Sequence, residues 1–160
     1  MLNSLRDERT LSSLPMTLFK YGFVLAISAL LILSSVDVIA GKKPVVVVNP
    51  SVSQSALKLK DLRSIYTMKK NTWSDGSPVT VFVLSNNAIT HKDFCRSLLK
   101  VFPRQLEAVW HRLVYSGTGE RPIEVGSEKE MMDRVTNTPG AIGYVQSEVL
   151  DENARILSIK

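Results

Sequence analysis

The sequence Thr138-Pro-Gly-Ala-Ile-Gly-Tyr-Val145 joins a tight turn directly to a buried strand. Adjacent proline and glycine are typical of a turn, because proline fixes one backbone angle and glycine adopts positive φ without steric cost. The apolar run Ala141–Val145 is short and contains β-branched and aromatic residues, which indicates a strand. Gly143 within this run indicates that another element approaches the strand closely, since glycine leaves room where a side chain would stand.

Further strands are predicted before and after this segment. Val79–Leu84 has the clearest strand pattern in the chain, and Pro44–Val48 is a β-branched run that ends at Asn49-Pro50. Arg155–Ile159 is the last predicted strand. Pro122-Ile123, by contrast, is interpreted as a crossing over the surface.

Helices are predicted between these strands by apolar residues that recur every three or four positions. The stripes are Leu59, Leu62, Ile65 and Tyr66; Phe94, Leu98, Leu99 and Phe102; Leu106, Val109, Trp110, Leu113 and Val114; and Met131, Met132 and Val135. Thr90 is the expected N-cap of the second helix, and Pro103 is expected to end that helix. Ser127 and Glu130 have the spacing of a capping box before the last one. Strands interleaved with helices predict an α/β domain with a small central sheet flanked by helices.

Composition excludes several classes of protein. The chain has 160 residues, of which 44% are apolar and 22% charged, as in ordinary globular proteins. This balance excludes a disordered or collagen-like chain, and a single cysteine excludes a disulfide-stapled miniprotein. Only one apolar stretch is long enough to consider as a membrane segment, which excludes a polytopic membrane protein.

The first forty residues have the pattern of an export signal. A weakly basic leader precedes the apolar run Phe23–Leu33, and Ala40 has the small side chain expected just before a cleavage site. We therefore expect a signal peptide at residues 1–40 and a periplasmic domain at residues 41–160, with membrane contact only through the signal before cleavage. A retained anchor is the alternative, although the run is shorter than the roughly 20 residues that span a bilayer.

The candidate metal and catalytic patterns are weak. His91 and Cys95 are four residues apart on one predicted helix, but no second ligand pair accompanies them, so we interpret them as a surface histidine and a buried thiol. Ser116-Gly-Thr-Gly119 lacks the strand-to-helix context of a nucleophile elbow, and no catalytic triad can be assembled. We expect no enzyme activity, no metal and no cofactor.

The chain carries 20 Lys and Arg against 15 Asp and Glu, a formal net charge of +5. The lysine pairs Lys42-Lys43, Lys58 with Lys60, and Lys69-Lys70 are interpreted as solvated surface, with an anion or an anionic membrane as alternative partners. Export argues against nucleic acid.

Two loops have the composition of anion sites. Ser85–Thr90 lies between a predicted strand and a helix start, where free N–H groups and the helix dipole favour an anion. The glycines of Ser116–Gly119 could form a backbone nest. Serine, asparagine and threonine before a helix also serve as ordinary caps.

Four segments together resemble the periplasmic phosphate-binding proteins of ABC importers. These segments are Val46–Pro50, Leu59–Tyr66, Lys69–Pro78 and Thr138–Val145. The last is similar to the Pro-Gly-Ala-Ile-Gly-Tyr-Val signature of that family nearly letter for letter. The resemblance spans about residues 45 to 159 and implies a single periplasmic-binding-protein-like lobe that binds phosphate.

The sequence departs from that family in two ways. The family's proteins are about twice as long, so this chain is expected to hold the crossing strand and the second lobe. The family's phosphate loop runs Arg, three residues, Ser-Gly-Thr, whereas here Leu84 stands for the arginine and Ala88-Ile89 for Ser-Gly. Thr90 fits the motif, and Ser85 and Asn87 are candidate substitutes. The resemblance thus implies a weakened phosphate site at Ser85, Asn87 and Thr90.

Two functions follow from these patterns. The first is an exported phosphate- or oxyanion-binding protein that works with an ABC permease, gripping the anion with backbone N–H groups and hydroxyls. The second is an envelope protein–protein interaction module that kept the fold and lost the ligand, using apolar surface that the missing lobe would have covered.

Overall fold

The computed structural model describes residues 43–150 and 154–160, so the leader predicted at residues 1–40 lies outside the described residues. The strands are β1 (Val45–Val48), β2 (Ala56–Leu57), β3 (Thr80–Leu84), β4 (Ile123–Val125), β5 (Ala141–Val145), β6 (Arg155–Ile156) and β7 (Ser158–Ile159). The helices are α2 (Leu59–Tyr66), α3 (Ile89–Phe94), η2 (Cys95–Leu99), α4 (Pro103–Tyr115), α5 (Glu128–Asn137) and η3 (Ser147–Val149). Within this part of the chain, no helix has the length and apolarity needed to cross a bilayer.

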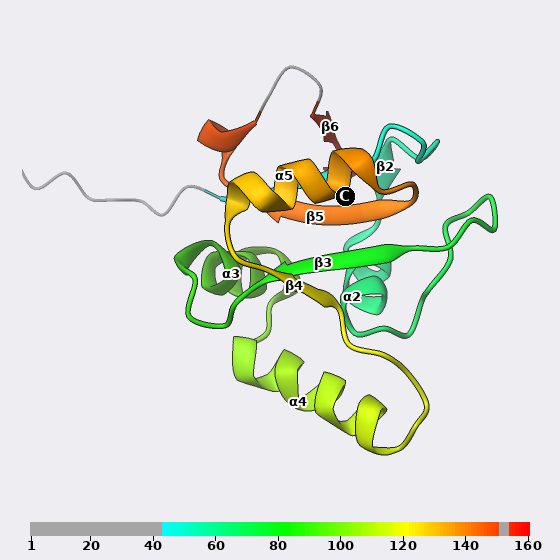
Figure 1. Ribbon diagram of the computed structural model, residues 1–160, viewed down its shortest axis with the longest axis vertical. Helices are drawn as coiled ribbons and strands as arrows, with labels where there is room; N and C mark the ends of the chain where they lie inside the picture. The colour runs from blue at the N-terminus through cyan, green and yellow to red at the C-terminus, as the bar shows by residue number, and fades with distance from the viewer. Residues whose placement is uncertain (1–42, 151–153) are drawn as a thin grey trace, which may run out of the picture. The chain divides into compact units, whose positions relative to one another are not determined.

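A five-stranded mixed sheet, in the order β4-β3-β5-β1-β6, forms the centre of the fold (Figure 1). The three strands β4, β3 and β5 run parallel, whereas β1 is antiparallel to both β5 and β6. β2 and β7 form a separate parallel pair. The predicted α/β domain with a small central sheet flanked by helices is confirmed.

Successive residues of β5 bring helices onto both faces of the sheet. A Cβ atom at Gly143 would lie 2.5 Å from Met131 Sδ and 2.8 Å from Val135 Cγ2, so α5 packs directly on this glycine. The next side chain, Tyr144, points to the opposite face and meets aromatic residues of α2 and α3. This alternation is the two-residue period of a strand. The close approach predicted at Gly143 is confirmed.

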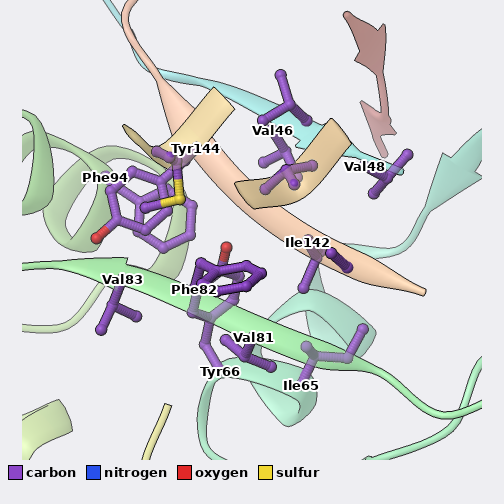
Figure 2. Packing of buried hydrophobic residues seen from close by; sticks show 14 of the residues in the cluster. Val46, Val48, Ile65, Tyr66, Val81, Phe82, Val83, Phe94, Ile142 and Tyr144 are labelled. Atoms are coloured by element: carbon purple, nitrogen blue, oxygen red, sulfur yellow. The ribbon is translucent and has the colours of Figure 1, made fainter. Parts of the chain in front are cut away.

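An aromatic cluster fills the face under α2 and α3. The Phe94 and Tyr144 rings are stacked with centroids 3.9 Å apart, and Tyr66 lies tilted against Phe94 at 4.7 Å. All three side chains are completely buried. Figure 2 shows Tyr66 and Ile65 of α2 beneath β3, with the stacked pair at one end of the cluster. Burial of this much apolar surface is the main stabilising contribution.

The turn before β5 is held by contacts that require its sequence. Gly140 has φ of +71°, and a Cβ there would clash with the carbonyl oxygen of Pro78. The Trp73 indole N–H donates to Gly140 O at 2.9 Å, so the Trp73 segment is fastened to this turn. The predicted Pro-Gly turn therefore has a glycine for both steric and conformational reasons.

The helix predicted after β3 differs from the expectation at both ends. Ala88, not Thr90, is the N-cap, and Thr90 lies buried inside α3. α3 continues as the π-helical segment η2 and stops at Lys100, which is in the left-handed conformation with φ of 56°. Pro103 begins α4 instead of ending the earlier helix, because proline is well suited to a first helical position. Phe102, predicted on the buried stripe, is consequently exposed.

The structure also defines the start of α5, the strand β4 and the strands at the C-terminal end of the chain. Ser127 caps α5 by accepting from Glu130 N at 3.1 Å, as predicted, while the Glu130 carboxylate accepts from Gly126 N at 2.8 Å. Ile123 is part of β4, so the surface crossing expected there was wrong. The last predicted strand is divided into β6 and β7, which belong to different sheets.

Candidate functional site

The carboxyl ends of the parallel strands define the edge where a site is expected. β3, β4 and β5 end at Leu84, Val125 and Val145, and polar residues follow each of them. Ligands of open α/β sheets bind outside this edge, because the loops that leave the strands meet there. The segment that carries Ser85, Asn87 and Thr90 leaves β3 at this edge and leads into α3.

A carboxylate lies at the centre of this edge. Glu128 Oε1 accepts from the Thr90 hydroxyl at 2.5 Å, and Glu128 Oε2 accepts from Gln146 N at 2.6 Å. Glu128 is the first residue of α5, where the helix dipole stabilises a negative charge. The Thr90 hydroxyl therefore donates its hydrogen bond within the protein. The Glu128 carboxylate lies next to the predicted phosphate loop.

The structure separates the three predicted site residues. Ser85 is half-buried and its carbonyl accepts from Ala88 N at 3.0 Å, which closes a turn. Thr90 is 5% exposed and faces Glu128. Asn87 is exposed and lines an open cleft beside the loop. Of the three, Asn87 alone lines this cleft.

This cleft has a volume of about 530 Å³ and lies between the β3–α3 loop, α3 with η2, and the beginning of α4. We call it the basic cleft. One side is formed by Asn86, Asn87, Lys92 and Arg96. Lys92 and Arg96 are one helical turn apart and so project on the same side of the helix. Figure 1 shows the start of α4 next to α3, below the strand ends.

The other side of the basic cleft comes from the start of α4, with Phe102, Pro103, Arg104 and Glu107. The first turn of α4 carries Arg104 and no acidic residue, which leaves the positive end of the helix dipole uncompensated. Glu107 is the acidic lining residue, and its carboxylate lies 3.6 Å from His111 Nε2. Three cations against one acid give the basic cleft a positive potential.

Behind the loop lies a buried polar chain that the sequence did not predict. The Tyr144 hydroxyl accepts from Leu84 N at 2.9 Å and lies 2.5 Å from His91 Nδ1. The Tyr144 hydroxyl and His91 Nδ1 therefore share one buried hydrogen bond. The other ring nitrogen, His91 Nε2, lies 3.5 Å from Cys95 Sγ. These hydrogen bonds connect the end of β3 to β5 and α3.

His91 is fully buried, so the expected surface position was wrong, whereas the expected burial of Cys95 is confirmed. Burial lowers the pKa of His91 to about 4 and raises the pKa of the Cys95 thiol to about 12. A neutral histidine and a protonated thiol are structural groups here. Among residues 43–150 and 154–160, no group of three or more His, Cys, Asp and Glu side chains is placed to hold a metal ion.

The second anion loop, Ser116–Gly119, uses its donors to end α4. Gly117 N donates to Val114 O at 3.0 Å and Thr118 N to Leu113 O at 3.1 Å. Gly117 has positive φ, as is common just past a helix end. These N–H groups cap helix carbonyls at the negative end of the dipole, so the loop is poorly suited to an anion.

No protein-family model and no curated protein matches this sequence. Solved structures do match its fold. A putative phosphate ABC transporter substrate-binding protein with bound phosphate from Clostridium perfringens has a TM-score of 0.60 at 15% identity. PstS from Borrelia burgdorferi has 0.58 at 17%, and an ABC-type phosphate transport receptor from Vibrio cholerae has 0.57 at 15%.

Each of these matches covers 74% of this chain and 45–47% of the solved protein. The chain therefore spans less than half the length of the structures that it resembles. The resemblance to phosphate-binding proteins of ABC importers, first seen in the Pro-Gly-Ala-Ile-Gly-Tyr-Val segment, is confirmed as a resemblance of fold.

Proposed function

We propose that this protein is an exported, non-catalytic receptor that binds phosphate or a similar oxyanion in the basic cleft and works with an ABC permease. The observation that carries the proposal is the convergence of Lys92, Arg96 and Arg104 on one open cleft. This cleft adjoins the loop where the phosphate-binding fold, by the resemblance, holds its ligand.

The side chains of the basic cleft supply the contacts an oxyanion needs. Arg96 and Arg104 offer planar guanidinium groups that donate two hydrogen bonds to one anion, and Lys92 adds a point charge. Asn86 and Asn87 contribute amide N–H donors. Because the cleft is open to water, each contact is weakened by solvent, and we expect affinity in the millimolar to high-micromolar range.

Within this proposal, the predicted residues have different roles. Asn87 contacts the anion. Ser85 closes the turn that positions Asn87, and Thr90 anchors the start of α3 to Glu128. The Glu128 carboxylate disfavours a second anion beside Thr90, because like charges repel most strongly where water is excluded.

Calorimetric titration of phosphate into the purified full-length protein tests the proposal, with chloride and sulfate as competing anions. We expect saturable binding that Arg96→Gln or Arg104→Gln weakens about three- to tenfold. Arg112→Gln is the matched control, since Arg112 is an exposed arginine of α4 outside the basic cleft. Thr90→Ala tests the loop separately. Loss of binding in Thr90→Ala with full binding in Arg96→Gln would move the site from the cleft to the loop.

Export is part of the proposal. Cleavage after Ala40 would release residues 41–160, and intact-mass measurement of the protein from a periplasmic extract checks it. A mass that includes residues 1–40 would show that the leader is retained.

The second candidate is an envelope interaction module, favoured by the exposure of Ile89 (74%) and Phe102 (61%) on the elements that border the cleft. Exposed apolar side chains of this size often mark protein interfaces. Light scattering tests self-association. A dimer that dissociates in the Ile89→Ser variant supports this candidate. A protein that stays monomeric and binds no other protein in the absence of phosphate contradicts it.

A further inference from the structure

The basic cleft is larger than its simplest ligand. Its volume of about 530 Å³ falls within the range of roughly 300–1,000 Å³ that is typical of sites for small organic molecules. A phosphate ion has one phosphorus and four oxygen atoms and would occupy a small part of this space. A liquid water molecule takes about 30 Å³, so most of the cleft would remain filled with water around a bare ion.

The lining has charged residues on both sides and two apolar residues at the start of α4. Lys92 and Arg96 come from α3 and η2, whereas Phe102 and Pro103 come from the start of α4. Phenylalanine is usually buried, yet Phe102 is 61% exposed at the rim of the cleft. An exposed ring beside cations matches a ligand with both an anionic and an apolar part.

The position of Phe102 is fixed by its backbone. Phe102 N donates to the Gln105 side-chain carbonyl at 3.0 Å, and Phe102 O accepts from Gln105 N at 2.9 Å. Pro103 follows directly and restricts the chain further. The ring is therefore carried on an ordered helix start, so little conformational entropy of the backbone is lost when a ligand packs against it.

We propose that the basic cleft binds an organic phosphate monoester that carries an aromatic or other flat apolar group. The phosphate lies among Lys92, Arg96 and Arg104, and the apolar group packs on Phe102 and Pro103. Glu107, at the same cleft, accepts a hydrogen bond from a hydroxyl or amine of the organic part and disfavours ligands with additional phosphates. This inference rests on the basic cleft of the proposed function and names the class of ligand that it takes.

The test compares three probes in calorimetric titrations of the full-length protein: phenyl phosphate, inorganic phosphate and phenol. We expect phenyl phosphate to bind about tenfold more tightly than phosphate, the factor that one aromatic contact typically contributes, and phenol not to saturate. Phe102→Ala should remove this tenfold advantage, measured as the ratio of the two affinities in the same variant. Because Phe102 is exposed, the variant should unfold at the same temperature as the parent protein.

Tyr115→Ala is the matched control. Tyr115 is an exposed aromatic residue of the same helix, 87% exposed and outside the cleft, so this variant should keep the full advantage of phenyl phosphate. Equal affinities for phenyl phosphate and phosphate would overturn the inference and leave the proposed function standing. An advantage that survives Phe102→Ala would also overturn it, since the apolar group would then bind elsewhere.

The remaining outcomes separate the two proposals. Binding of phenyl phosphate without measurable binding of inorganic phosphate would support the organic ligand and contradict a phosphate receptor. Failure of both phosphate probes to bind would overturn both proposals.

Discussion

The Glu128 side chain determines the role of the Thr90 hydroxyl. From the sequence, Thr90 is a hydroxyl at a helix start, a position where such a residue caps the helix more often than it binds an anion. The structure gives it neither role, because Thr90 Oγ1 donates a hydrogen bond to Glu128 Oε1, 38 residues later, at 2.5 Å. The sequence contained no signal for this pair. Long-range polar contacts depend on the packing of α5 against the sheet, and that packing is not encoded in local spacing.

The buried His91 makes stability depend on pH. Burial holds its folded-state pKa at about 4, whereas the unfolded chain has the ordinary value of about 6.5. The unfolded state therefore binds more protons between these values. The contribution of His91 to stability is complete above about pH 6.5 and is lost as the pH falls toward 4. The shift corresponds to a loss on the order of 3 kcal/mol.

We expect urea unfolding at a series of pH values to show this loss. His91→Gln should flatten the slope between pH 6.5 and 4, because the titrating group is gone while Tyr144 keeps a polar neighbour. Carboxylates also titrate in this range, so the informative quantity is the difference in slope between the parent protein and the variant. His111→Gln, on the outer side of α4, is the control. Identical slopes for the parent and His91→Gln would contradict the assignment.

At the scale of elements, the strands and helices with strong apolar patterns were predicted correctly. β3, β5, α2 and α5 lie where their sequence patterns placed them. β4 was missed because it is only three residues long and two of them are exposed, so no alternating pattern marks it. The end of η2 was missed because Lys100, not a glycine, adopts the left-handed conformation there. Pro103 was assigned to the end of the preceding helix, because proline occurs both just after a helix and at its first position.

The packing of α5 on β5 leads to a prediction at this scale. Gly143→Ala would place a Cβ 2.5 Å from Met131 Sδ and 2.8 Å from Val135 Cγ2, so the helix must shift or side chains must change rotamer. We expect the free energy of unfolding to fall by about 1–3 kcal/mol. Chemical denaturation measures it.

Two further variants make this measurement specific. Gly119→Ala is the matched control, since its Cβ would make an ordinary 3.5 Å contact with Leu113, and it should be nearly neutral. Met131→Ala combined with Gly143→Ala should show a coupling energy, because the two residues share one contact. Strictly additive losses would mean that α5 does not limit the size of residue 143.

For the whole molecule, the sequence predicts one lining residue of the proposed site, Asn87, and does not reveal its cations. The strand–loop–helix order was sufficient to place Asn87 at the carboxyl edge. The basic cleft was not found, because Lys92, Arg96 and Arg104 come from three different elements. In the sequence these three residues are separated by four and eight positions. The same spacing is typical of the solvent-exposed face of a helix, so it did not indicate a binding site.

The charge of the whole chain gives the last prediction. A net charge of +5 and an open cation-lined cleft attract anions through a field that salt screens. The Debye length falls from about 10 Å at 0.1 M salt to about 3 Å at 1 M, so remote charges stop contributing. We expect phosphate affinity to fall several-fold over this range in calorimetric titrations with sodium chloride. Lys129→Glu, outside the cleft on α5, should reduce affinity at low salt and have no effect at 1 M. Affinity that is independent of salt would show that the anion is bound away from solvent, by neutral donors such as those at the β3–α3 loop.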